Sequence, residues 1–156
     1  FVGDHGVNLP YPYDVPLSYN HVPLIIHAPG LFKQPETRHQ IGNQTDIFPT
    51  VMGLVREDYV QNTLGYDLFQ EKRPFAYFSQ DHKMGVVNDR FLYIARKSGR
   101  ETLCDYRAAT GEDLSLLYPA LMDSMRNYAC SQLQVAQMMI REKRTGGVGF
   151  LRGGSK

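Results

Sequence analysis

The stretch Phe1-Val2-Gly3-Asp4-His5-Gly6 begins the chain and sets the fold that we expect for it. Its two leading apolar residues suit the end of a buried strand, and the two glycines permit unusual backbone angles on either side of the Asp-His pair. In open α/β sheets, ligands bind beyond the carboxyl ends of the strands. A carboxylate beside an imidazole also suits a divalent metal. The stretch therefore predicts an α/β fold with Asp4 and His5 at a ligand-binding edge.

Composition excludes some classes of partner. The 156 residues are 42% hydrophobic, enough for one domain with a core or for a piece of a larger one. The net charge is +1 with no basic cluster, so we expect no nucleic-acid partner. No apolar run approaches the roughly 20 residues that cross a bilayer. Cys104 and Cys130 lie in no metal-binding spacing and are expected to act as small, partly buried apolar residues.

Residues 7–20 form a loop, because three prolines interrupt any helix or central strand. A loop that follows the Asp-His turn is placed to contact substrate, and we name Tyr11, Tyr13, Asp14 and the nearby His21 as substrate-binding candidates. The same side chains can equally pack the loop onto its own domain. The sequence leaves both roles open.

The next segments indicate a layered α/β arrangement. Residues 22–28 are a nearly continuous apolar run before Pro29-Gly30, which is typical of a buried strand covered on both faces. Thr45 or Asp46 is expected to cap a helix that ends near Val55. We therefore expect a partial, mostly parallel sheet with helices over residues 1–73, the C-terminal part of a catalytic domain.

A different pattern begins near residue 75. Four short runs rich in aromatic and aliphatic residues are separated by turns and predict a four-stranded antiparallel sheet over residues 75–78, 84–87, 91–95 and 102–106. Apolar residues at helical spacing predict one long helix over residues 119–144, with its stripe in the core. Residues 74–145 form this second subdomain, and the glycine-rich residues 146–156 are expected to be a flexible tail.

Other chemistry-bearing motifs are weak. Asp81-His82 repeats the Asp-His pair, but Lys83 follows it and the short spacing indicates a hairpin turn rather than a metal site. The chain has no G-x-S-x-G, G-x-G-x-x-G, C-x-x-C or H-E-x-x-H motif. Any chemistry is therefore metal-assisted and centred on Asp4 and His5.

Three motifs in order resemble a known family: residues 1–6, residues 22–30 and residues 44–54. Together they resemble the sulfatase branch of the alkaline phosphatase superfamily and, within it, bacterial lipoteichoic-acid-synthase-like sulfatases or phosphoglycerol transferases. The resemblance implies a largely parallel sheet with a small C-terminal antiparallel sheet. It also implies cleavage or transfer of a sulfate or phosphate ester at a divalent metal, with Mn, Zn, Ca and Mg not distinguished. Asp4 and His5 would be metal ligands.

The same resemblance places the nucleophile, a Thr, Ser or formylglycine, and a further acidic ligand earlier in the family's chains. We therefore expect this chain to be the C-terminal portion of a longer enzyme, inactive by itself, from a membrane-anchored protein outside the cytoplasm. Its apolar faces over residues 22–28 and 45–55 are expected to pair with the missing N-terminal part or with a second copy. The alternative is a non-catalytic α/β binding or assembly module in which Asp4-His5 is a hydrogen-bonded turn.

Overall fold

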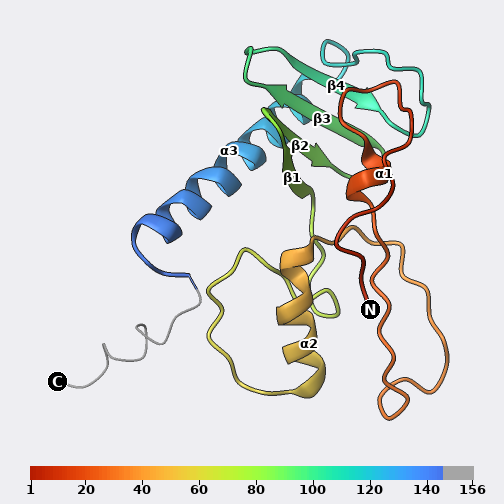
Figure 1. Ribbon diagram of the computed structural model, residues 1–156, viewed down its shortest axis with the longest axis vertical. Helices are drawn as coiled ribbons and strands as arrows, with labels where there is room; N and C mark the ends of the chain where they lie inside the picture. Colours follow the sequence, from red (N-terminus) through yellow and green to blue (C-terminus); the bar gives the residue numbers. More distant parts are fainter. Residues whose placement is uncertain (146–156) are drawn as a thin grey trace.

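A computed structural model describes residues 1–145, and the expected flexible tail of residues 146–156 lies outside the described residues (Figure 1). The α/β class, the small antiparallel sheet and the long final helix are confirmed. In chain order the elements are α1 (Leu17–Asn20), the 3-10 turn η1 (Gln44–Asp46), α2 (Ile47–Val55), β1 (Ala76–Gln80), β2 (Lys83–Val87), β3 (Phe91–Arg96), β4 (Glu101–Asp105) and α3 (Pro119–Arg141).

The sheet is a meander in the order β1-β2-β3-β4, with antiparallel pairing throughout. Asp81 and His82 form the tight turn between β1 and β2, as expected, and Asp81 takes the left-handed φ of 49°. Such short connections permit only antiparallel neighbours. The sequence pattern therefore predicted the number, order and direction of these strands.

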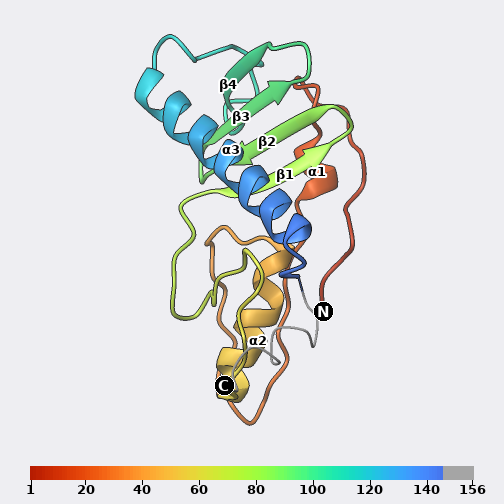
Figure 2. The ribbon, with the colours of Figure 1, turned by 90° about the vertical axis from the view of Figure 1, so that its left-hand side faces the viewer.

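The central strand β3 is buried on both faces because two different segments cover the sheet. Phe91, Tyr93 and Ala95 point into a cluster with Met122, Met125 and other residues of α3. Leu92 and Ile94 point to the opposite face, against Tyr13 and Val15 of the N-terminal loop. Figures 1 and 2 show the result, three layers in which α3 and the segment leading into α1 lie on opposite sides of the strands.

The apolar stripe of α3 is core over only part of its length. Met122, Met125 and Ala129 are buried against the sheet. The helix then continues past β1 (Figure 2), where Leu133 and Met138 are each 37% exposed and Ile140 is 67% exposed. The prediction of one continuous core stripe therefore applies to the first half of the helix.

The segment before η1 differs from the buried strand that we expected. Residues 22–28 form no named strand, and Leu24 makes one isolated antiparallel bridge with Val2. Phe1 exchanges backbone hydrogen bonds with Ile25, which is 56% exposed. Within residues 1–145 all named strands belong to the antiparallel sheet, so the expected parallel pairing is not formed there. A strand buried on both faces needs neighbouring strands and two covering layers, and the described residues supply neither.

Helix α2 agrees with the prediction, although its start is built differently. Asp46 is the N-cap residue of α2, as expected, but its side chain makes no capping bond to this helix. The carboxylate instead caps the preceding turn η1, where it accepts the backbone N–H of Asn43 at 2.6 Å. The helix ends at Val55, and Arg56 takes the left-handed conformation that closes many helices.

Side chains and a loop bind some of the outward-facing backbone groups at the two edges of the sheet. At the β1 edge, Asn43 Nδ2 donates to the carbonyl of Tyr77 at 2.6 Å. At the β4 edge, Leu103 donates its N–H to Asp113 at 3.2 Å and accepts a bond from the N–H of Leu114 at 2.7 Å. These contacts give both outer strands partners other than a further strand.

Candidate functional site

The Asp4-His5 pair lies on the surface of the turn that we expected to be functional. The Asp4 side chain is 90% exposed and the His5 side chain 52% exposed, with 3.8 Å between Asp4 Oδ2 and His5 Nε2. The other carboxylate oxygen of Asp4 accepts the backbone N–H of His5 at 2.9 Å. One oxygen and one ring nitrogen therefore remain side by side and accessible.

The imidazole of His5 is oriented by two contacts. Its ring stacks on the ring of Tyr19, with centroids 4.6 Å apart and planes at 13°. Its Nδ1 lies 2.9 Å from the carbonyl of Gly6. When Nδ1 carries the proton and donates to this carbonyl, the lone pair of Nε2 is free to bind a ligand.

The backbone of the turn is held by residues that are distant in the sequence. Gly6 donates its N–H to the carbonyl of Tyr19 at 2.8 Å. Gln44 Nε2 lies 3.0 Å from the carbonyl oxygens of both Gly3 and Asp4. A Cβ on Gly6 would come within 2.2 Å of the Ser18 carbonyl oxygen, so the close approach of the two backbones requires glycine at this position.

The donor set fits part of a divalent metal site. Metal bonds to carboxylate oxygen and imidazole nitrogen are about 2.0–2.2 Å long, so atoms 3.8 Å apart can share one ion. Within residues 1–145 no group of three or more His, Cys, Asp or Glu side chains is placed to hold a metal. Structural and catalytic metals take about four to eight ligands. Asp4 and His5 therefore provide two ligands of a site that needs more.

Two of the substrate-binding candidates fasten the N-terminal loop onto the sheet. Tyr13 is buried and donates its hydroxyl to the carbonyl of Asp105 at 2.8 Å, and burial raises the pKa of its phenol. The carboxylate of Asp14 is bound by Arg96 at 2.6 and 2.7 Å, which holds the pKa of Asp14 below its usual value. Lys83 Nζ lies 3.6 Å from the same carboxylate. The sequence left open whether these side chains bind substrate or pack the loop onto its own domain, and these contacts of Tyr13 and Asp14 pack the loop onto the sheet.

The other two candidates are more accessible. Tyr11 is 36% exposed, and its ring lies 5.4 Å from that of Tyr13. His21 is exposed, and its carbonyl borders Gly6. A role for Tyr11 or His21 in substrate binding stays a prediction.

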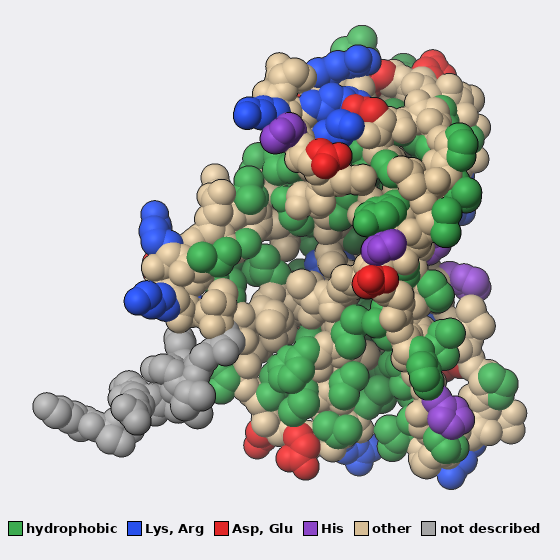
Figure 3. Space-filling model, viewed as in Figure 1, with side chains coloured by type: hydrophobic (Ala, Val, Ile, Leu, Met, Phe, Trp, Pro, Cys, Tyr) green, Lys and Arg blue, Asp and Glu red, His purple; other side chains and the backbone are tan. Residues whose placement is uncertain are grey.

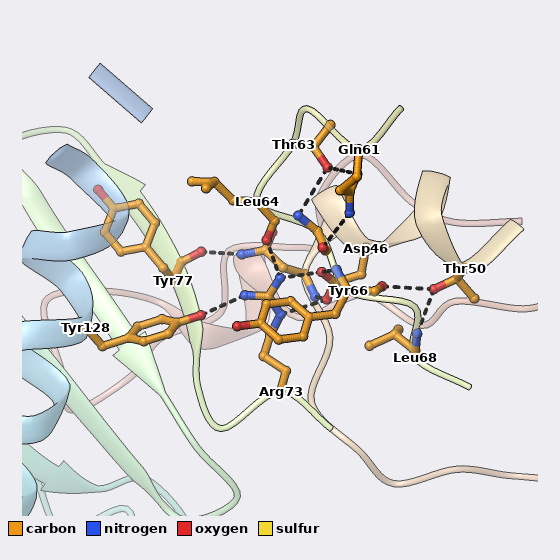
Figure 4. A network of polar contacts seen from close by, with 12 residues as sticks. Asp46, Thr50, Gln61, Thr63, Leu64, Tyr66, Leu68, Arg73, Tyr77 and Tyr128 are labelled. Carbon is orange, nitrogen blue, oxygen red and sulfur yellow. Dashed lines mark hydrogen bonds and ion pairs between the residues drawn. The ribbon is translucent and has the colours of Figure 1, made fainter. Parts of the chain in front are cut away.

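A buried polar network that the sequence did not reveal lies behind η1 (Figure 4). Asp46 is 0% exposed and Arg73 is 3% exposed. The guanidinium makes a bidentate ion pair with the carboxylate and also donates to the hydroxyl of Tyr128 at 2.7 Å and to the carbonyl of Leu64 at 2.8 Å. Burial opposes the charged form of Arg73, but the interactions with Asp46 and Tyr128 together outweigh it and raise the pKa of Arg73.

This network joins elements from both halves of the chain. Asp46 belongs to η1, which follows the Asp-His segment, whereas Tyr128 belongs to α3. The backbone N–H groups of Asn43 and Tyr66 donate to the remaining positions on the Asp46 carboxylate, at 2.6 and 2.8 Å. The sequence indicated only a helix cap at Asp46, because an ion pair to a residue far along the chain leaves no periodic signal.

Apolar side chains are exposed on α2 and on the segment that pairs with Phe1 and Val2. Hydrophobic side chains gather over α2 in Figure 3, where Phe48, Val51 and Val55 are 48%, 44% and 53% exposed. Leu24 and Ile25 are also exposed. The two segments that we expected to present uncovered apolar faces do so.

Comparison with known proteins agrees with the resemblance at the level of the broad family. The Sulfatase family model matches residues 1–57, a little more than a third of the chain. No curated protein matches the chain. The match includes the Asp-His turn, η1 and α2. It supports a sulfatase-like, alkaline-phosphatase-related hydrolase origin for the part of the chain in which Asp4 and His5 lie.

Proposed function

We propose that the chain is the C-terminal portion of a metal-dependent hydrolase or transferase of sulfuric or phosphoric esters, sulfatase- or phosphoglycerol-transferase-like, with Asp4 and His5 as metal ligands. One observation carries the proposal. Asp4 Oδ2 and His5 Nε2 lie 3.8 Å apart and exposed on a turn held by long-range hydrogen bonds, inside the segment that matches the Sulfatase family model.

In this proposal the residues of this chain bind the metal and orient its ligands. Asp4 offers a carboxylate oxygen, and His5 offers Nε2 while Gly6 and Tyr19 fix its ring. A divalent metal bound there would neutralise charge on the ester oxygens and favour the ionised nucleophile. Two ligands are fewer than such an ion requires, so the proposal assigns the nucleophile and the remaining ligands to another segment of the enzyme. The chain by itself is then expected to be inactive and to bind metal weakly.

The alternative proposal is a non-catalytic binding or assembly module. In this alternative the hydrogen bond from the His5 N–H to the Asp4 carboxylate is a local turn contact, and it accounts for the pair without a metal. The exposed apolar face of α2 is equally compatible with assembly.

Metal titration of the protein as its gene encodes it separates the two proposals. Asp4→Ala and His5→Ala are expected to weaken metal affinity by more than about tenfold and to remove turnover of sulfate or phosphate esters, because each removes a direct ligand. The matched control is Asp81→Ala, in the other Asp-His pair, which we assign to a hairpin turn. Unchanged metal binding in Asp4→Ala would remove this residue from the site and favour the module. Parallel assays with a chromogenic sulfate ester and a phosphodiester identify the ester class.

We also propose, from the family resemblance, that the enzyme acts outside the cytoplasm and is anchored to a membrane. No helix within the described residues is both long and apolar enough to cross a bilayer. Protease treatment of intact cells tests the proposed location, since a catalytic part outside the cytoplasm would be cut without lysis.

A further inference from the structure

We infer that Gln44 is a positioning residue for the Asp4-His5 pair, an inference that rests on the proposed function. The side-chain amide of Gln44 lies 3.0 Å from the carbonyl oxygen of Gly3 and 3.0 Å from that of Asp4. An amide NH₂ group has two hydrogens, so one side chain can donate to both carbonyls. These two carbonyls belong to the peptide groups on either side of Asp4.

These two hydrogen bonds from Gln44, which we call the Gln44 clamp, matter because the backbone of the turn is intrinsically flexible. Glycine precedes Asp4 and follows His5, and glycine has the widest choice of backbone conformations. His5 has separate supports in the Tyr19 ring and the Gly6 carbonyl. Within residues 1–145 the Asp4 carboxylate has one hydrogen bond, from the neighbouring backbone N–H. The direction of the Asp4 side chain therefore depends on its backbone, which Gln44 holds on both sides.

Gln44 is itself held in place by the network behind it. It is the first residue of η1, and Asp46 in the same turn is fixed by the buried ion pair with Arg73. On the other side, Asn43 donates to the β1 backbone at Tyr77. The side-chain amide of Gln44 therefore extends from a backbone segment that is held on both sides, by Asn43 and by Asp46. Ligands of a metal must be held to within about 0.5 Å of their productive positions, which a clamp on a rigid base can achieve.

Gln44→Met tests the inference, because methionine has nearly the same size and cannot donate a hydrogen bond. The matched control is Gln61→Met, which removes another exposed bond from a glutamine amide to a backbone carbonyl, the 2.8 Å bond to Gly65. Circular dichroism checks that both variants keep the fold. Should Gln44→Met not fold, Gln44→Glu replaces it in the metal-free measurement, since ionised glutamate keeps the size and also lacks the donor.

Two measurements on the 156-residue chain give separate answers. The first is amide hydrogen exchange at His5 and Gly6 without metal, because the N–H groups of these two residues are hydrogen-bonded in the turn. The second is the Mn²⁺ concentration that half-broadens the His5 ring signal in an NMR spectrum, which detects weak binding. Gln44→Met is expected to speed exchange at these amides and to raise this Mn²⁺ concentration about tenfold, the effect of losing one or two ordinary hydrogen bonds. Gln61→Met is expected to change neither.

The outcomes distinguish this inference from the proposed function. Unchanged exchange at His5 and Gly6 in Gln44→Met overturns the positioning role, whatever the metal response. Faster exchange with an unchanged Mn²⁺ response also overturns it, because the clamp would then order the turn without placing the ligands. If Asp4→Ala leaves the Mn²⁺ response of the parent chain unchanged, the metal assignment fails, and the positioning role for metal binding fails with it.

Discussion

Replacing Arg73 by methionine is expected to destabilise the chain severely. The substitution removes the bidentate partner of Asp46, a carboxylate that is 0% exposed, and leaves its negative charge buried. It also removes the bonds to Tyr128 and Leu64. Breaking a buried ion pair on one side typically costs about 3–5 kcal/mol. The two backbone N–H groups that still donate to Asp46 favour the lower end of that range.

Two further variants make the prediction quantitative. Tyr128→Phe removes one hydrogen bond to the charged guanidinium and keeps the aromatic ring, so we expect a loss of about 1.5–3 kcal/mol. Arg38→Met removes an exposed pair with Glu36, in which the side chains are 42% and 60% exposed, and a contact of the guanidinium over the Phe69 ring at 4.4 Å. It should cost about 1 kcal/mol. Replacing Asp46 by asparagine together with Arg73→Met should recover part of the loss, because no buried charge then remains and the amide oxygen can still accept a backbone N–H from Asn43 or Tyr66.

Urea unfolding followed by far-ultraviolet circular dichroism measures these differences. The expected order of destabilisation is Arg73→Met, then Tyr128→Phe, then Arg38→Met. If Arg73→Met is unfolded in water, Tyr128→Phe still provides a measurable intermediate value. An Arg73→Met chain as stable as Arg38→Met would refute the reasoning, because the buried pair would then contribute no more than a solvated one.

Three more predictions follow from contacts of the N-terminal part. Asp14→Asn should reduce the loss of stability in acid, because Arg96 lowers the pKa of Asp14 below 3.8. The contribution of the Asp14 carboxylate to folding stability is complete above about pH 4 and disappears as the pH falls through the lowered pKa. Urea unfolding at neutral pH and at about pH 2 measures this difference. Gly6→Ala should destabilise the Asp-His turn by roughly 1–3 kcal/mol, as backbone overpacking does, whereas Gly30→Ala has open space and should be nearly neutral in the same assay. Val51→Lys should shift light scattering towards monomer by charging the apolar face of α2, and an equal effect from Leu116→Lys would show that this face is not the contact.

The sequence predicted the elements whose signals are local. Short aromatic runs separated by turns define an antiparallel meander, because each strand needs only the next one as its partner. The assignment of Asp81-His82 to a hairpin followed from the same spacing. The periodic apolar stripe defined α3, although it could not indicate where the helix extends past the sheet and its second half becomes exposed.

Burial and long-range contacts were harder to predict. An apolar run such as residues 22–28 indicates that burial is favourable, but it does not identify the covering layer, and in the described residues Ile25 is 56% exposed. Tyr13 reaches Asp105, and Asp46 reaches Arg73, across large separations in sequence. Nothing periodic marks such pairs. The Asp-His turn was therefore predicted as a site, whereas the contacts of Gln44 with Gly3 and Asp4 join distant residues and leave no sequence signal.

The bonded edges of the sheet bear on how the chain can aggregate. Open edge strands recruit further strands and promote fibrous, edge-to-edge growth. Here Asn43 occupies the outer carbonyl of Tyr77, and Asp113 and Leu114 occupy both backbone groups of Leu103. A docking strand would first have to displace these bonds. Association of the folded chain is therefore expected to proceed through helix faces, producing oligomers that do not bind amyloid dyes.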